Sequence, residues 1–257
     1  MGHPFLHNNL LAKEKRIHMK AILFDLDGTL LPMDTEAFIK NYTKELAPKV
    51  AHIVEPDQFI KALWTGTEAM MSNKDAAKTN ETVFMNAFLP IAEVEKDEIW
   101  PVLDNFYNYD FASFSYLTSP TSSAREIVNT ALTKGYKVAI ATNPVFPKVA
   151  IEHRLEWAGL KDLPLDHVTY YENSYYTKPH TEYYQSIAEE LGVNTNDCVM
   201  VGNDKQEDMA AGNCGMKTYL VHGHVIDRGT DSFAVNDEGT LEQLTKDISD
   251  NTGIFKT

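Results

Sequence analysis

Two aspartates, Asp25 and Asp27, stand at the end of a short apolar run and are followed by Gly28. The run, residues 21–24, reads Ala-Ile-Leu-Phe, which is typical of a strand buried on both faces of a sheet. Carboxylates there are costly to desolvate unless a cation compensates them, and Mg²⁺ prefers such oxygen ligands. Asp25 suits attack as a carboxylate nucleophile, and Asp27 suits a general acid and base. The same residues also fit a simple Asp-Gly turn with no catalytic role. Motifs elsewhere in the chain are needed to distinguish the two interpretations.

Composition narrows the class of protein. The 257 residues are 43% hydrophobic and 23% charged, as in an ordinary globular protein. A formal net charge of -14 argues against a nucleic-acid or anionic membrane surface as partner. Cys198 and Cys214 are too few for a disulfide framework, and no apolar stretch reaches the length of a membrane span. We therefore expect a cytoplasmic protein whose partner is neither a nucleic acid nor a membrane.

The elements around the two aspartates divide the chain into three parts. Residues 1–18 mix histidines with basic residues and are expected to be an extension outside the fold. Between residues 34 and 118, four stretches carry apolar side chains at helical spacing, which predicts a small helical bundle with the aromatic residues as packing surface. These stretches carry Phe38, Tyr42 and Leu46; Phe59, Leu63 and Trp64; Phe84, Phe88 and Ile91; and Ile99, Leu103 and Phe106.

From residue 119 the pattern changes to alternating strands and helices. We expect strands at 136–141, 167–170, 198–201 and 217–221, with helices at 122–134, 147–158, 179–191, 207–214 and 241–248. Such alternation predicts an α/β fold, a doubly wound parallel sheet with ligands at the carboxyl ends of its strands. Residues 19–33 and 119–257 would form this core. Residues 34–118 exceed what a strand-to-strand connection needs, so they are expected to form a cap domain inserted beside the two aspartates.

Two further positions suit phosphate binding. Thr142 and Asn143 follow the predicted strand at 136–141, where a hydroxyl and backbone N–H groups suit a phosphate oxygen. Lys178 precedes Pro179, which is expected to open a helix. Lys178 would hold both the phosphate and the nucleophilic carboxylate. Turn chemistry and a solvated surface lysine are the respective alternatives.

The strand at 198–201 repeats the pattern of the first strand, because it also ends in glycine and carboxylates. Gly202 is followed by Asn203, Asp204 and, four residues after Asp204, Asp208. Parallel strands end at one edge, so Asp25, Asp27 and Asp204 are expected to converge on one cation, with Asp208 as an outer or additional ligand. Glu207 is expected to be solvated.

These pieces, in this order, resemble the haloacid dehalogenase superfamily. Asp25-Leu26-Asp27-Gly28-Thr29 matches its first motif, Thr142 its second, Lys178 its third, and Asp204 with Asp208 its fourth. The helical insert looks like the first class of cap in that family. The resemblance implies a Rossmann-like sheet, bound Mg²⁺ with the Asp27 carbonyl as one ligand, and an aspartyl-enzyme intermediate. Many members have Gly-Asp where this chain has Gly202-Asn203-Asp204, so either Asn203 or Asp204 faces the metal; its charge favours Asp204.

The resulting expectation is a Mg²⁺-dependent phosphatase for a small phosphomonoester. A phosphomutase or dehalogenase of the same superfamily and a non-catalytic binding protein are the alternatives. Asp27 speaks against a dehalogenase because halide departure needs no proton donor, and the retained carboxylates and lysine speak against a non-catalytic protein. Residues 34–118 contain seven lysines, fourteen acidic residues and no arginine. Arginine is the side chain best suited to bind a second anionic group of a substrate. Substrates whose part beyond the phosphate is neutral are therefore expected to be preferred.

Overall fold

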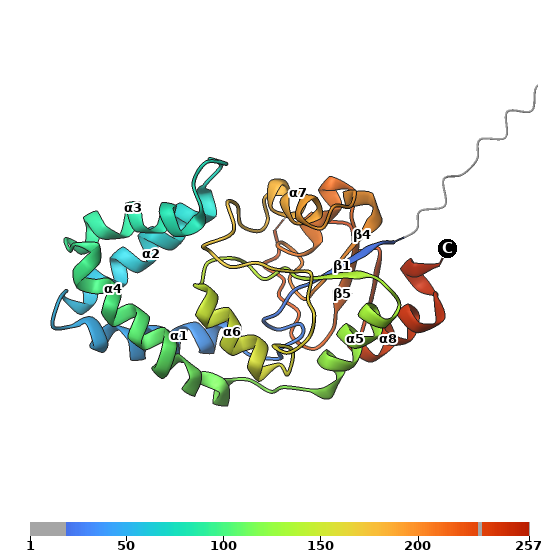
Figure 1. The fold of residues 1–257 in the computed structure, drawn as a ribbon, viewed down its shortest axis with the longest axis horizontal. Coiled ribbons are helices and arrows are strands. Elements are labelled where there is room, and N and C mark those ends of the chain that lie inside the picture. The colour runs from blue at the N-terminus through green and yellow to red at the C-terminus, as the bar shows by residue number, and fades with distance from the viewer. Residues whose placement is uncertain (1–18, 231–232, 257) are drawn as a thin grey trace, which may run out of the picture.

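The computed structural model describes residues 19–230 and 233–256; the expected extension, residues 1–18, lies outside the described residues. Within them, six strands form one sheet in the order β3-β2-β1-β4-β5-β6 (Figure 1). Every neighbouring pair is parallel. The strands are β1 Ala21–Phe24, β2 Lys137–Ile140, β3 His167–Val168, β4 Cys198–Gly202, β5 Lys217–Val221 and β6 Asp237–Gly239. The sheet confirms the α/β class predicted from strand and helix alternation.

The central strand β1 is buried on both faces, as its apolar sequence predicts. Side chains of a strand alternate between faces. Accordingly, Ile22 and Phe24 belong to one apolar cluster and Ala21 and Leu23 to another. The first cluster also contains residues of α5, Ser122–Thr133; α6, Lys148–Trp157; and α8, Leu241–Asp250. The second contains residues of α7, Thr181–Glu190, and of a 3₁₀ helix, Met209–Cys214. Helices thus cover both faces of the sheet.

A second group of helices follows β1 and lies at one end of the molecule, on the left in Figure 1. Its members are α1 Thr35–Val50, α2 Pro56–Ser72, α3 Asn80–Ala92 and α4 Lys96–Asn105. A π-helical turn, Phe106–Asp110, and a 3₁₀ helix, Phe111–Leu117, lead back toward α5. Phe38, Phe59 and Phe88 are buried, as their helical spacing predicts. Trp64 was expected to pack in the same way, but its side chain is 48% exposed.

Hydrogen bonds join the start of α3 to loops that follow strands of the sheet. The fully buried Asn80 donates its side-chain amide to the carbonyls of Pro144, at 3.1 Å, and Tyr176, at 3.2 Å. The backbone N–H of Asn80 donates to Ser174 at 2.7 Å. At the end of α2, the Met71 carbonyl lies 2.7 Å from His180 Nε2. The helical group is therefore held against the strand ends by specific polar contacts.

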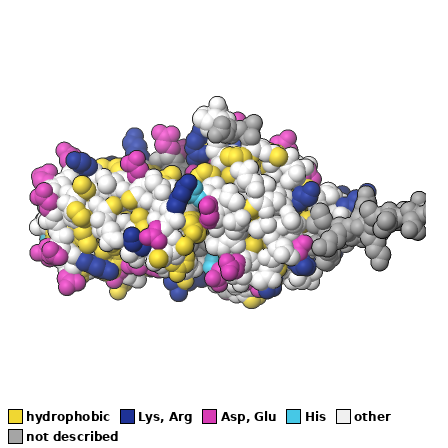
Figure 2. Space-filling view, turned by 90° about the horizontal axis from the view of Figure 1, so that it is seen from above, with side chains coloured by type: hydrophobic (Ala, Val, Ile, Leu, Met, Phe, Trp, Pro, Cys, Tyr) yellow, Lys and Arg dark blue, Asp and Glu magenta, His cyan; other side chains and the backbone are white. Residues whose placement is uncertain are grey.

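The outer surface of this helical group is acidic. Figure 2 shows magenta carboxylates along the left end of the molecule, with fewer basic side chains among them, where α2, α3 and α4 lie in Figure 1. Among residues 19–230 and 233–256, no helix is long and apolar enough to cross a membrane.

Several elements differ locally from the sequence predictions, and the 3₁₀ helix Met209–Cys214 takes the place of the helix expected at 207–214. Helix α7 begins at Thr181 with His180 as its N-cap, two residues later than expected, and Pro179 precedes it in a cis peptide bond with Lys178. Strand β3 is shorter than predicted because only two of its residues pair with β2. Strand β6 was not predicted, since its sequence, Asp-Glu-Gly, has no apolar run to mark it.

Candidate active site

The register of the sheet places three strand ends level with one another. Phe24, the last residue of β1, is opposite Ile140 of β2 and Val201 of β4. The backbone N–H of Asp25 continues the pairing by donating to Val201 O at 2.8 Å. The segments that carry Asp25, Thr142 and Asn203 therefore leave the sheet at the same edge, as the parallel topology predicts.

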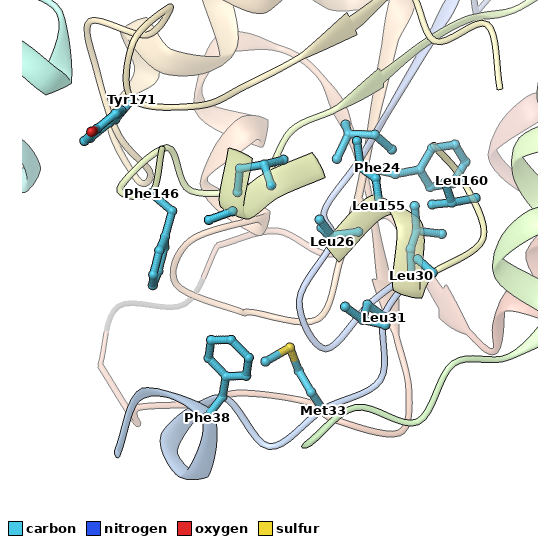
Figure 3. Packing of buried hydrophobic residues seen from close by; sticks show 14 of the residues in the cluster. Phe24, Leu26, Leu30, Leu31, Met33, Phe38, Phe146, Leu155, Leu160 and Tyr171 are labelled. Atoms are coloured by element: carbon cyan, nitrogen blue, oxygen red, sulfur yellow. The ribbon is translucent and has the colours of Figure 1, made fainter. Parts of the chain in front are cut away.

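A tight loop turns the chain back directly after Asp25. Gly28 has φ +83°, a left-handed conformation that suits glycine, and a Cβ there would lie 2.4 Å from Asn203 Nδ2. The loop is closed by Gly28 N–H donating to Leu31 O at 2.9 Å and by Leu31 N–H donating to Leu26 O at 2.8 Å. Figure 3 shows Leu26, Leu30 and Leu31 of this loop beside Leu155 of α6. The apolar side chains anchor the loop, so its polar side chains have a fixed position.

The Asp25 carboxylate is held through both oxygens. Lys178 Nζ donates to Oδ1 at 2.7 Å, and Thr29 Oγ1 lies within donating distance of Oδ2 at 3.0 Å. The Thr29 hydroxyl lies 2.9 Å from Asn203 Oδ1 as well. Asp25 and Asn203 therefore present neighbouring oxygen atoms, and the structure brings Lys178 and Asp25 together as expected from the motifs.

Lys178 is shared between two carboxylates. Its Nζ also donates to Asp208 Oδ1 at 2.6 Å, and the side chains of Lys178 and Asp208 are 2% and 1% exposed. Burial lowers the pKa of Lys178, but Asp208 and Asp25 outweigh it and raise this pKa well above its ordinary value. Burial raises the pKa of Asp208, and Lys178 opposes the change. Asp208 therefore fixes the lysine beside Asp25 while also accepting the Asp204 N–H at 2.9 Å.

The Asp27 carboxylate points to a different partner, Arg154 of α6. Arg154 Nη1 donates to Asp27 Oδ2 at 2.7 Å, and the arginine side chain is 2% exposed. Burial raises the pKa of Asp27, while Arg154 lowers it and Asp25 raises it further. A carboxyl whose pKa is raised holds a proton more readily, which is the property that a general acid needs.

Asp204 does not share a direct contact with Asp25 or Asp27. Its carboxylate accepts from Arg228 Nη1 at 2.7 Å and from the backbone N–H groups of Gln206 and Glu207, both at 2.9 Å. Asn203, rather than Asp204, is thus hydrogen bonded to the hydroxyl beside Asp25. The convergence of Asp25, Asp27 and Asp204 on one point stays a prediction. Among the described residues, no group of three or more carboxylate, His or Cys side chains is arranged to hold a metal ion.

Glu207 is part of the site, and the prediction that it is solvated is wrong. Its side chain is 21% exposed, and its Oε2 accepts from Asn143 Nδ2 at 3.1 Å. Burial raises the pKa of Glu207, Asp204 adds to this, and Lys178 and Arg228 oppose it. The Asp204 side chain, by accepting the N–H groups of the next turn, directs Glu207 toward the loop after β2.

Thr142 and Asn143 lie at the same pocket in different ways. The Thr142 side chain is buried at the pocket wall, while its carbonyl accepts from Thr169 Oγ1 and Tyr183 OH, both at 2.7 Å. Asn143 connects two loops, because its Oδ1 accepts from Lys178 N–H at 3.3 Å. The structure thus places Thr142 and Asn143 in the wall of the cavity that Lys178 also lines.

The charged side chains described above, with Thr142, Asn143 and Asn203, line one cavity of about 210 Å³ at the carboxyl edge of the sheet. Residues of the helical group complete its wall, namely Thr35, Phe38, Ile39 and Met71. Five carboxylates and three cationic side chains line it, a formal excess of two negative charges. The carboxylates are Asp25, Asp27, Asp204, Glu207 and Asp208, and the cations are Arg154, Lys178 and Arg228.

Comparison with known proteins identifies the family. A family model described as haloacid dehalogenase-like hydrolase matches residues 19–215. The chain belongs to this family. Among curated relatives of this haloacid dehalogenase-like hydrolase, the pyrophosphatase PpaX of Halalkalibacterium halodurans is 23% identical over 238 residues, 93% of this chain and 99% of that protein. The glyceraldehyde 3-phosphate phosphatase of Methanothermobacter thermautotrophicus is 25% identical over 244 residues, 88% and 99% of the two chains.

A solved structure has the same fold. The phosphatase of this superfamily from Thermococcus onnurineus matches with a TM-score of 0.56 and 23% identity, over 89% of this chain and 97% of that one. The predictions of a Rossmann-like sheet and of a hydrolase of the haloacid dehalogenase superfamily are therefore confirmed.

Two site residues of this haloacid dehalogenase-like hydrolase were missed from the sequence. Arg154 and Arg228 are half of the four arginines in the chain, and both line the cavity. Arginine is rare in this chain, which has nineteen lysines. This rarity was a signal that pointed to the two residues, because arginine is the cation best suited to planar pairing with carboxylates. The distances between these arginines and their carboxylates could not be inferred from spacing along the chain.

Proposed function

We propose that this hydrolase is a phosphatase that acts on a small phosphomonoester through an aspartyl-phosphate. The observation that carries the proposal is the buried contact of 2.7 Å between Lys178 Nζ and Asp25 Oδ1, at a strand end that also presents Asp27. The names of two curated relatives, a pyrophosphatase and a glyceraldehyde 3-phosphate phosphatase, support hydrolysis of a bond to phosphorus. The net charge of -14 supports a small metabolite over a nucleic acid or an anionic membrane as the partner.

The reaction divides into two transfers of one phosphoryl group. In the first, a carboxylate oxygen of Asp25 forms a bond to phosphorus, the ester P–O bond breaks, and Asp27 gives its proton to the departing oxygen. In the second, Asp27 takes a proton from water, whose oxygen attacks phosphorus, and the bond to Asp25 breaks to release phosphate. Lys178 and the Thr142 hydroxyl stabilise negative charge on the phosphoryl oxygens in both transfers.

We also propose that Mg²⁺ is required. The cavity suits it because Asp25 and Asn203 present adjacent oxygens through the Thr29 hydroxyl, and oxygen is the ligand that this ion prefers. The formal excess of two negative charges in the lining would repel a phosphate dianion without a divalent cation. The carboxylates of Asp25 and Asp204 and the carbonyl of Asp27 would hold the ion, and Asp208 would lie nearby. Asn203 is the alternative ligand to Asp204. When bound, the ion would neutralise charge on the phosphate.

The segment 34–118 is proposed to act as a cap over this cavity. Ile39 of α1 and Met71 of α2 reach the cavity wall, and the hydrogen bonds of Asn80 hold the helical group against the loops of the sheet. A lid of this kind excludes water and supplies contacts to the part of the substrate beyond the phosphate.

The alternatives use the same site differently. A dehalogenase does not need the proton that Asp27 would donate, whereas a phosphomutase uses both carboxylates and differs only in its product. Initial rates with Mg²⁺ across a panel of phosphorylated metabolites, with phosphate release and isomer formation followed together, distinguish the phosphatase from the mutase. Full activity after treatment with EDTA would contradict the metal requirement.

The decisive variant is Asp25→Asn, which preserves size and removes the attacking charge. Turnover should fall to background while circular dichroism and thermal unfolding remain close to those of the wild type. The matched control is Asp57→Asn, an exposed carboxylate on α2 that should leave activity unchanged. Activity of Asp25→Asn within about tenfold of the wild type, a change of only about 1.4 kcal/mol in the barrier, would remove Asp25 from its role.

A further inference from the structure

Arg154 is an unusual residue for the interior of a hydrolase domain. It lies on α6, its side chain is 2% exposed, and its Nη1 donates to Asp27 Oδ2 at 2.7 Å. Arg154 is separated from Asp27 by 127 residues, so the contact joins the loop after β1 to a helix that follows β2. A buried arginine whose partner is the proposed general acid calls for an explanation beyond packing.

Three aromatic rings enclose the guanidinium. Its central carbon lies 4.1 Å from the ring centre of Phe146, 4.8 Å from that of Phe38 and 5.6 Å from that of Phe111. These rings come from the loop before α6, from α1 and from the 3₁₀ helix after α4, and Figure 3 shows Phe38 and Phe146 on the same side of the core. Rings replace water around the cation and leave it little freedom to turn.

The ion pair leaves specific atoms without partners. Among the described residues, neither Arg154 Nε nor Asp27 Oδ1 has a hydrogen-bond partner, although both atoms are buried. Buried polar atoms without partners are rare in folded proteins, and they often mark a place where a ligand completes the hydrogen bonding. Arg154 occupies Oδ2 and Oδ1 is closed to water, so the ion pair fixes the orientation of the whole Asp27 carboxyl group, which lines the cavity.

We infer that Arg154 is a positioning residue for Asp27, a role that rests on the proposed phosphatase function. By pairing with Oδ2 while the three rings enclose it, Arg154 fixes the orientation of the carboxyl group that gives its proton to the oxygen leaving phosphorus. In that step Asp25 forms its bond to phosphorus, the ester P–O bond breaks with its electron pair remaining on the leaving oxygen, the O–H bond of Asp27 breaks, and the proton passes to that oxygen. Arg154 itself forms and breaks no covalent bond.

Two other roles for Arg154 lead to different outcomes. An arginine that only stabilises the fold would slow every substrate equally when replaced. An arginine that grips a second anionic group of the substrate would raise KM for substrates with that group and leave the others unchanged. Replacing a positioning residue instead slows hydrolysis more for a substrate whose leaving group depends more on the proton from Asp27.

The experiment compares two leaving groups. 4-Nitrophenyl phosphate releases a stable phenolate that needs no proton, whereas a simple alkyl phosphate releases an alkoxide that does. For Arg154→Met, kcat/KM should fall on the order of 100-fold with the alkyl phosphate and by less than about fivefold with 4-nitrophenyl phosphate, since general acid catalysis is worth about 10²–10⁴ in rate. Arg154→Lys preserves the charge without the planar fork and should recover part of the loss.

A double-variant cycle tests whether the effect passes through Asp27. In an Asp27→Asn background, adding Arg154→Met should lower kcat/KM with 4-nitrophenyl phosphate by no more than about threefold, and it should leave the alkyl phosphate at the rate of Asp27→Asn alone. If Arg154→Met does not fold, Arg154→Lys and Phe146→Leu replace it, each with a smaller loss confined to the alkyl phosphate.

Equal losses with both substrates, or losses that add to those of Asp27→Asn, would overturn the positioning role. So would a rise in KM limited to substrates with a second anionic group. The proposed function fails separately: in that case the wild type would release phosphate from neither compound, or Asp25→Asn would retain activity with 4-nitrophenyl phosphate.

Discussion

Replacing Lys178 by methionine tests the centre of the site, because one lysine compensates two buried carboxylates. Methionine has a similar length and no charge, so the change removes the contacts of 2.7 Å to Asp25 and 2.6 Å to Asp208 with little loss of packing. Breaking a buried ion pair by removing one partner costs about 3–5 kcal/mol, since an uncompensated charge remains. We expect a loss of stability in this range at pH 8.

The loss of stability caused by Lys178→Met should depend on pH, and the burial of Asp208 determines the direction of this dependence. Burial already raises the pKa of Asp208, and removing Lys178 raises this pKa further. The folded variant then binds a proton that the unfolded chain has released, so its stability falls as pH rises through the raised pKa. The variant should therefore be closer to the wild type at pH 5.5 than at pH 8.

Urea unfolding at pH 5.5 and pH 8 measures this difference, and kcat/KM measures the loss of charge stabilisation, expected on the order of 10²–10³. Lys205→Met is the matched control, because Lys205 is 40% exposed and pairs at 3.0 Å with an exposed carboxylate, Asp227. Its stability and activity should stay close to those of the wild type. A Lys178→Met protein as stable at pH 8 as Lys205→Met would show that the two carboxylates do not depend on this lysine.

Two further substitutions test how the site is positioned. Gly202→Ala would place a Cβ 2.1 Å from Asp208 Cγ, so Asp208 must move away from Lys178. We expect kcat/KM to fall on the order of 100-fold. Full activity of this variant would contradict the tight fit between Gly202 and Asp208. Gly212→Ala, whose Cβ would meet its nearest neighbour at 3.9 Å, should be neutral and serves as its control. Asn80→Ala removes the donors of two loop carbonyls and should lower the free energy of unfolding by about 1–3 kcal/mol in a urea titration, whereas an unchanged midpoint would show that water replaces them.

The parallel sheet explains why part of the site could be predicted from the sequence. A short apolar run buried on both faces, followed at once by carboxylates, fixed the place of Asp25 at the end of β1. Since parallel strands end at one edge, Thr142 and Asn203 had to emerge beside it, and the register bears this out. Such inferences need only the period of a strand and the rule that ligands lie at its carboxyl end.

The contacts of Arg154 depend on packing between distant segments and could not be predicted in this way. Ile151 and Leu155 are four residues apart on its helix, a spacing that favours burial on one face, but this spacing does not show that an arginine on the same helix reaches Asp27. The enclosing rings come from three separate segments. Glu207 was misjudged for a related reason, because the hydrogen bonds of Asp204 set the direction of the turn that carries it.

The two unforeseen arginines bear on which substrates the enzyme prefers. From its sequence, the segment 34–118 offers no arginine to a second anionic group, and Figure 2 shows carboxylates over the end of the molecule that this segment forms. Arg154 and Arg228 enter the cavity from the sheet domain, but each is already paired, at 2.7 Å to Asp27 and at 2.7 Å to Asp204. Neither brings an uncompensated positive charge to the substrate.

We therefore expect monophosphates with a neutral remainder to be preferred over bisphosphates and nucleoside triphosphates. Mg²⁺ would offset the two excess negative charges of the cavity, a sum that already includes Lys178, so the lining has no excess positive charge to balance the phosphate. A second anionic group would then face the acidic cap without a free cation among the described lining residues. The measurement is kcat/KM for matched pairs of substrates that differ by one anionic group, at constant ionic strength. Faster hydrolysis of the more anionic member in most pairs would mean that Arg154 or Arg228 leaves its carboxylate to bind substrate, and the charge argument would fail.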